Sequence, residues 1–214
     1  MRRTGIFQLL TALVLVITLS GGTSEAAGNP RLRYLGSSNI SLPTAYMMGE
    51  TSYINDAGHN MVMYTQKAQG KLVEFSLLRH LNDAESGKNV VNFKLNLLEE
   101  DTMIPNIVWG VGDAGMTLGS RVFYFAGSKT FEAFAATVHG GFIKDPVTTE
   151  KKTFVSVEKT ILPLVIVAGE RVEGQTSYGI KMRPYPGVSL EYARRDDEDG
   201  GEDAIYKLQY IKSF

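Results

Sequence analysis

The three histidines are the side chains best suited to acid–base or metal chemistry, because the chain contains no Cys. His80 lies close to Asp83 and Glu85, so these three could form an acid–base or metal-ligating cluster in a loop. A solvated loop explains the same residues. His139 falls in an alternating segment and is interpreted as a side chain facing a lumen. No Ser lies in a Gly-x-Ser-x-Gly elbow. We therefore predict no catalytic residues, no cofactor and no enzymatic activity.

A run of acids near the C-terminus is a further candidate metal site. Clustered carboxylates are the ligands that Ca²⁺ prefers. The spacing differs from that of an EF-hand, and an outward-facing solvated loop is the other reading, so the metal prediction is none apart from this candidate. The acids are Asp196, Asp197, Glu198, Asp199, Glu202 and Asp203.

The elements that would position these residues follow a rule seen most clearly in residues 89–97. Val91, Phe93 and Leu95 fall on one face of this stretch, whereas Asn92 and Lys94 fall on the other. A period of two predicts a β-strand with one apolar and one polar face. A soluble barrel or sandwich would turn the apolar face inward. A membrane barrel would turn it towards lipid.

The same alternation recurs along the chain in segments of eight to eleven residues, near the length of a tilted membrane strand. No helical stretch is expected beyond the N-terminus. We predict an all-β, antiparallel, up-and-down transmembrane β-barrel of about twelve strands, with ten as the alternative count. The first strand is expected over residues 43–54, after an irregular polar stretch at 28–41. Long polar connections mostly alternate with short turns, which is typical of outer-membrane barrels.

The polar faces of the predicted strands would converge in the lumen. Acids and bases occur there in similar numbers, so we expect Lys/Arg–Glu pairs inside the barrel. Such pairs would fill a narrow barrel, whereas in a wider one they would line a wet pore. The predicted lumen-facing residues are Glu74, Asn92, Lys94, Glu158, Lys181, Arg183, Glu191, Lys207 and Gln209.

The N-terminus predicts export. Arg2 and Arg3 precede an apolar run at residues 6–19, and small residues follow at 24 and 26. We interpret residues 1–26 as a cleaved signal peptide and 27–214 as a single barrel domain. A membrane anchor is the alternative, but the run is short for a span of about 20 residues. A net charge of −1 argues against a nucleic-acid partner.

The C-terminal residue, Phe214, ends an alternating segment that also carries Tyr206 and Tyr210. A terminal aromatic residue is typical of outer-membrane barrels and predicts recognition by the barrel-assembly machinery. The predicted partners are therefore outer-membrane lipid and this machinery, and the predicted location is the outer membrane of a diderm bacterium.

Residues 36–142 carry a family resemblance. The matching motifs are residues 41–45 (SLPTA), 97–100 (LLEE), 104–105 (IP), 110–113 (GVGD), 119–120 (GS) and 126–129 (AGSK). They resemble the YjbH-type family of exopolysaccharide-associated outer-membrane proteins, although Gly127 interrupts an Ala-Ser-Lys motif and the family's usual members are several times longer. The resemblance implies a barrel in the cell envelope with polysaccharide as a further partner.

Three functions follow as alternatives. The first is an outer-membrane barrel with a structural or conduit role, linked by the resemblance to exopolysaccharide export. The second is a soluble periplasmic or secreted lipocalin-like barrel that binds an apolar ligand. The third is a barrel enzyme acting on lipids, which would need a Ser/His set that the sequence does not reveal.

Overall fold

The computed structural model describes residues 32–68, 70, 72–82, 85–144, 151–172, 174–196 and 201–211. The predicted signal peptide, the acids at 197–199 and Phe214 lie outside these ranges. Among the described residues, no helix is long and apolar enough to cross a membrane.

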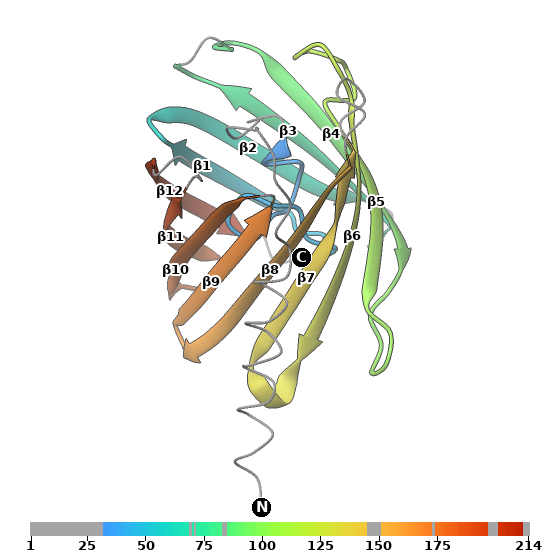
Figure 1. The fold of residues 1–214 in the computed structure, drawn as a ribbon, viewed down its shortest axis with the longest axis vertical. Coiled ribbons are helices and arrows are strands. Elements are labelled where there is room, and N and C mark those ends of the chain that lie inside the picture. Colours follow the sequence, from blue (N-terminus) through green and yellow to red (C-terminus); the bar gives the residue numbers. More distant parts are fainter. Residues whose placement is uncertain are drawn as a thin grey trace, which may run out of the picture.

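Twelve antiparallel strands form one closed barrel, so the predicted fold class is confirmed. Each strand pairs with its neighbours in sequence, and β1 closes the ring against β12 (Figure 1). A 3₁₀ turn, η2 (Glu132–Phe134), lies in the β6–β7 connection. The strands are β1 (Glu50–Asp56), β2 (His59–Ala68), β3 (Val73–His80), β4 (Asn89–Leu98), β5 (Asn106–Gly112), β6 (Val122–Phe131), β7 (Ala136–Lys144), β8 (Lys151–Leu162), β9 (Val165–Val172), β10 (Gln175–Tyr185), β11 (Val188–Asp196) and β12 (Glu202–Ile211).

The two faces of the barrel have opposite polarity. On β3, Glu74 and Ser76 are buried inside, whereas Phe75 and Leu77 are 49% and 41% exposed on the outer surface. This is the reverse of a soluble barrel, whose apolar side chains point inward. The outer surface carries further exposed large apolar side chains on most strands, including Tyr53, Tyr64, Val91, Trp109, Phe123, Ile180, Leu190, Tyr192 and Leu208.

Exposed tyrosines flank apolar side chains on the outer surface of β10 and β12. On β10, Tyr178 and Tyr185 are exposed near opposite ends of the strand, with Ile180 and Met182 between them. On β12, the exposed residues run in the order Tyr, Leu, Tyr from 206 to 210. Amphipathic rings flanking an apolar band are the pattern of a surface that meets lipid between two interfaces.

The first strand begins later than predicted, and the residues before it have a different role. β1 starts at Glu50 instead of residue 43, and residues 32–49 run inside the ring of strands (Figure 1). We call residues 32–49 the plug. Every plug residue from 32 to 45 is buried. The predicted strand is wrong here because partners inside the lumen, not neighbouring strands, satisfy this part of the backbone.

The plug supplies the centre of the apolar core. Each of the three buried apolar clusters contains at least one plug residue: Leu35 and Leu42 in the first, Tyr34 in the second and Ile40 in the third. The other members of these clusters are mostly strand residues, which explains why some strands carry apolar residues on both faces. One face meets the outer surface and the other packs on the plug.

Two glycines on the inner face of β5 make room for this packing. A Cβ on Gly110 would lie 2.1 Å from the Tyr124 ring, and a Cβ on Gly112 would lie 2.4 Å from Leu35. Tyr124 crosses the space above Gly110 and donates a hydrogen bond to the Leu35 carbonyl at 3.1 Å. Side chains at these two positions would exclude the plug from its observed place.

Candidate functional site

The filled lumen is the site that the fold creates. The plug makes few backbone hydrogen bonds to itself: Tyr34 to Ser41, Asn39 to Leu42 and Thr44 to Ser37. The positive φ of Gly36, +126°, turns the chain where a strand cannot continue. A buried irregular backbone needs other partners for its N–H and C=O groups. The inner side chains of the barrel provide them.

Glu170, on β9, holds the middle of the plug. Its carboxylate accepts hydrogen bonds from the backbone N–H of Ile40 at 3.2 Å, of Ser41 at 3.0 Å and of Leu42 at 3.2 Å. The Ser41 hydroxyl donates a fourth bond at 2.5 Å. Three successive N–H groups aimed at one carboxylate form an anion-binding nest. Here the anion belongs to the barrel wall.

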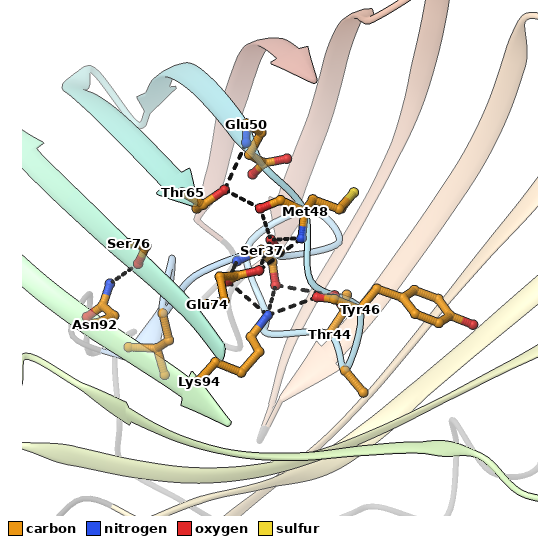
Figure 2. A network of polar contacts seen from close by, with 12 residues as sticks. Ser37, Thr44, Tyr46, Met48, Glu50, Thr65, Glu74, Ser76, Asn92 and Lys94 are labelled. Carbon is orange, nitrogen blue, oxygen red and sulfur yellow. Dashed lines mark hydrogen bonds and ion pairs between the residues drawn. The ribbon is translucent and has the colours of Figure 1, made fainter. Parts of the chain in front are cut away.

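Glu74 and Lys94 hold the two ends of the plug's central turn together (Figure 2). Glu74 accepts hydrogen bonds from the backbone N–H of Ser37 at 2.8 Å and of Met48 at 3.0 Å. Lys94 pairs with Glu74 at 3.1 Å and donates to the carbonyls of Ser37 and Tyr46 at 3.3 and 3.0 Å. Each charge therefore has both an ionic partner and backbone groups, which is what a buried pair requires.

Two further lysines bind the plug from the opposite wall. Lys207 donates to the carbonyls of Asn39 and Ile40 at 3.1 and 2.7 Å and lies 3.5 Å from Glu191. Lys181 donates to the Asn39 side-chain oxygen at 2.7 Å and pairs with Glu158 at 3.3 Å. The ion pairs on the inner face therefore also serve the plug.

At the end of the barrel formed by the β1–β2, β3–β4, β5–β6 and β11–β12 connections, an arginine cluster fixes the start of the plug. Arg195 makes two hydrogen bonds to Asp56, at 2.8 and 3.0 Å, and one to Asp203 at 2.7 Å. Arg33 of the plug lies 3.7 Å from Asp56, and the Tyr34 hydroxyl donates to Asp56 at 2.9 Å. We call this end the long-loop end.

At the opposite end, which we call the short-turn end, Tyr46 ties the plug to two turns. Its hydroxyl donates to Glu100 at 2.7 Å and lies 2.5 Å from the Thr130 hydroxyl. Burial raises the pKa of the Tyr46 phenol, so it stays protonated as a donor. Burial by itself would raise the pKa of Glu100, but hydrogen bonds from Tyr46, Thr130 and Lys129 outweigh it and lower that pKa.

The structure places most of the predicted lumen residues on the buried inner face. Glu158 is only partly buried there. Arg183 is exposed at the short-turn end of β10, next to the register shift between Met182 and Tyr185, and so lies outside the buried face. The residues buried inside are Glu74, Asn92, Lys94, Lys181, Glu191, Lys207 and Gln209.

Sequence reasoning missed the plug and several of its anchors, notably Glu50, Asp56, Glu170 and Arg195. Glu170 lies in a segment that is apolar on both sides of it, which hid its inward direction. The glycines on the inner face of β5 were the available signal for the plug. A glycine leaves space on the inner face of the wall, and that space implies that another part of the chain fills it.

The buried Ser128–His139 pair is the one contact that resembles part of a hydrolytic site. The Ser128 hydroxyl lies 2.7 Å from His139 Nδ1, and both residues are 1% exposed. The Ser128 oxygen also accepts a hydrogen bond from the Ala45 backbone N–H at 2.8 Å. A hydroxyl covered by the plug in this way acts as another anchor. No substrate could reach it while the plug is in place.

Two of the three described acids of the C-terminal acidic run, Glu202 and Asp203, have basic partners, whereas Asp196 Oδ1 is buried without a hydrogen-bond partner among the described residues. Asp203 pairs with Arg195 at 2.7 Å and Glu202 with Arg194 at 3.1 Å. Asp197, Glu198 and Asp199 lie outside the described residues. Within the ranges that the structure describes, no three His, Asp or Glu side chains are grouped so as to hold a metal ion.

Within the described part of the chain, one cavity lies on each side of the plug. The cavity at the long-loop end has a volume of about 420 Å³ and is lined partly by Tyr34, Met61 and Leu78. The cavity at the short-turn end has a volume of about 740 Å³ and is more polar, with Tyr46 and Glu100 in its wall. The plug separates the two, so the lumen is closed between them.

Comparisons with known proteins identify the architecture. No protein-family model matches the chain, and no curated protein matches its sequence. Among solved structures, the KdgM porin superposes with a TM-score of 0.58 at 9% identity, over 77% of this chain and 99% of that one. A mutant of the Rhodopseudomonas blastica porin matches with a TM-score of 0.45 at 11% identity, over 72% of this chain. The chain spans 55% of that porin's length. The likeness to the KdgM porin shows a shared barrel fold, and the YjbH-type resemblance stays a prediction.

Proposed function

We propose that this protein is an outer-membrane barrel that serves as a conduit closed by its own plug. The membrane location is supported by the exposed apolar outer surface, by the tyrosines that flank the apolar residues of β10 and β12, and by the porin-like fold. These features argue against the lipocalin-like alternative, whose apolar side chains would face inward.

The observation that carries the conduit proposal is how the plug is held. Its backbone is bound by polar side chains of the wall, at Glu74, Lys94, Glu170 and Lys207. Water can replace each of these polar contacts if the plug leaves, and its departure would also expose the apolar wall residues that now pack on it. A barrel wide enough to hold an extra segment would then enclose an aqueous path.

The inner charges suggest which solutes this path would admit. Among the described strands, five acids and five bases are buried on the inner face, so their charges cancel. A balanced wall lined with Ser, Asn and Gln hydroxyls and amides favours neutral polyhydroxy solutes over ions. We therefore propose a saccharide as the solute, which agrees with the exopolysaccharide link implied by the YjbH-type resemblance.

The location is tested by membrane fractionation with gel electrophoresis of unboiled and boiled samples. We expect the protein in the outer-membrane fraction, with a fast-running unboiled band that shifts on boiling. A soluble periplasmic protein without a shift would refute the membrane proposal.

Departure of the plug from the lumen is tested by cysteine labelling. The chain has no native Cys, so an introduced thiol is the only one that reacts. Ser38→Cys places a thiol in the buried plug, and Ser86→Cys places one on an exposed loop as the control. A water-soluble maleimide should label the control at once and the plug thiol slowly, at the rate of plug departure. Liposome swelling in neutral oligosaccharides should rise in the variants that label fastest. A plug thiol that never reacts would identify the barrel as a structural protein.

A further inference from the structure

The cavity at the long-loop end has features that the closed conduit does not require. Its floor consists of apolar side chains from three sources: Met61, Leu78 and Val90 from the strands, Leu118 from the β5–β6 loop, and Leu35 from the plug. A path for saccharides would be lined by polar groups at this depth. Its volume of about 420 Å³ lies within the range of ~300–1,000 Å³ that is usual for small-molecule sites.

Two polar atoms on this cavity's lining residues are buried and lack a hydrogen-bond partner among the described residues. They are the Ser120 hydroxyl and the Nε of Arg195. Ser120 is 8% exposed and Arg195 is 3% exposed. An unsatisfied buried donor destabilises a structure, so a molecule that presents an oxygen to the Ser120 hydroxyl would gain from the contact.

The charges around the cavity decide the charge of that molecule. Arg33 and Arg195 line it, and so do four acids, of which Asp56 and Asp203 already pair with Arg195. The other two acids are Glu85 and Asp113. Among the described lining residues acids outnumber bases by two, and Lys88 offsets one of these acids by pairing with Glu85, so an anionic head group would meet an excess of one acid.

We propose that this cavity binds a small neutral apolar molecule that carries one hydrogen-bond-accepting oxygen, such as an alcohol or ester. The apolar body packs on Met61, Leu78 and Val90, and the Ser120 side chain turns so that its hydroxyl donates to the oxygen. This site does not depend on plug movement, because Tyr34 and Leu35 form part of its wall while the plug is in place.

Methyl NMR of ¹³C-methionine-labelled protein in lipid nanodiscs tests the proposal with 1-octanol as the probe. Met61 reports on the cavity, whereas Met182 is exposed on the outer surface and reports on octanol dissolved in the bilayer. We expect the Met61 resonance to shift and saturate while Met182 moves little. Octanoate should bind roughly tenfold more weakly, because its carboxylate faces the excess of acids.

A matched pair of variants separates the cavity from the bilayer. Val90→Phe fills the cavity, whereas Val91→Phe adds the same ring to the outer surface one residue away. Saturable shifts should vanish in the first variant and persist in the second. If Val90→Phe fails to fold, Leu118→Phe narrows the same cavity from a loop.

Three outcomes would overturn the proposal. Met61 and Met182 could shift together without saturation, which would mean bilayer partitioning only. The cavity-filling variants could bind octanol as the unsubstituted protein does. Octanoate could bind as tightly as octanol, which would refute the neutral ligand. None of these results bears on maleimide labelling of the plug, so the two proposals fail separately.

Discussion

Replacing Glu170 by Ala should release the middle of the plug. The carboxylate accepts hydrogen bonds from three consecutive backbone N–H groups and from the Ser41 hydroxyl. Hydrogen bonds to a charged group contribute about 1.5–3 kcal/mol each, so four give a gross value of about 6–12 kcal/mol. Desolvating the carboxylate offsets several kcal/mol of this, which leaves a net contribution of about 3 kcal/mol.

A loss of about 3 kcal/mol should raise the fraction of barrels with the plug displaced roughly a hundredfold, since each 1.4 kcal/mol is a factor of ten. The assay is the rate of maleimide labelling at Ser38→Cys, which leaves all four Glu170 bonds in place, with and without Glu170→Ala, in barrels shown to be folded by their heat-modifiable band. Glu170→Gln, which keeps one acceptor oxygen, should fall between the two. Ser86→Cys should label equally fast in all backgrounds.

Equal labelling rates in Glu170→Ala and in its parent would refute the reasoning. That result would mean that the apolar contacts of the plug, and not its hydrogen bonds to the wall, keep the lumen closed. Unfolded protein would be recognised separately by the loss of the fast-running band.

Three other changes test different parts of the structure. Gly110→Val should lower the thermal midpoint of the unboiled band, because its Cβ would overlap the Tyr124 ring; an unchanged midpoint would contradict the packing described for β5. Leu208→Arg should cost about 2–4 kcal/mol in urea titrations of liposome-embedded protein if the residue meets lipid near the midplane, and a cost near zero would contradict lipid exposure. The pKa of Glu100 is lowered from its ordinary value of 4.5, because hydrogen bonds from Tyr46, Thr130 and Lys129 outweigh the effect of burial. Its stabilising contribution is therefore complete above its ordinary pKa and is lost as the pH falls through the lowered value, so Glu100→Gln should flatten the acid limb of the stability profile.

The charged inner face also explains why the barrel holds a non-helical, non-strand segment. A buried ion pair alone is a weak source of stability, because desolvation offsets much of its attraction. Here Glu74 and Lys94 bind each other and also bond the plug backbone. The same groups therefore satisfy two needs, and truncating either member would leave both a charge and several backbone groups unpaired.

The sequence by itself determined the fold. Residues 89–97 and the last three strands alternate strictly between apolar and polar side chains. Successive side chains of a strand point to opposite faces, so this alternation assigned the apolar residues to one face of the wall and the polar residues to the other. Alternation along most of the chain led to twelve strands. Opposite charges on the polar faces led to the expectation of internal pairs, and pairs such as Glu74–Lys94 and Lys207–Glu191 are present in the structure.

Only the tertiary structure decided what fills the lumen. The plug has no periodicity to predict it, because its backbone is bonded by side chains from strands that are distant in sequence, such as Glu170, 129 residues from Ser41. The side chain of Glu170 points inward only because the barrel closes around it. The need for glycine at positions 110 and 112 depends on the positions of the Tyr124 and Leu35 side chains in the folded protein. Local patterns encode strands and their faces. The closed lumen depends on contacts between residues far apart in the chain, and no local pattern carries that information.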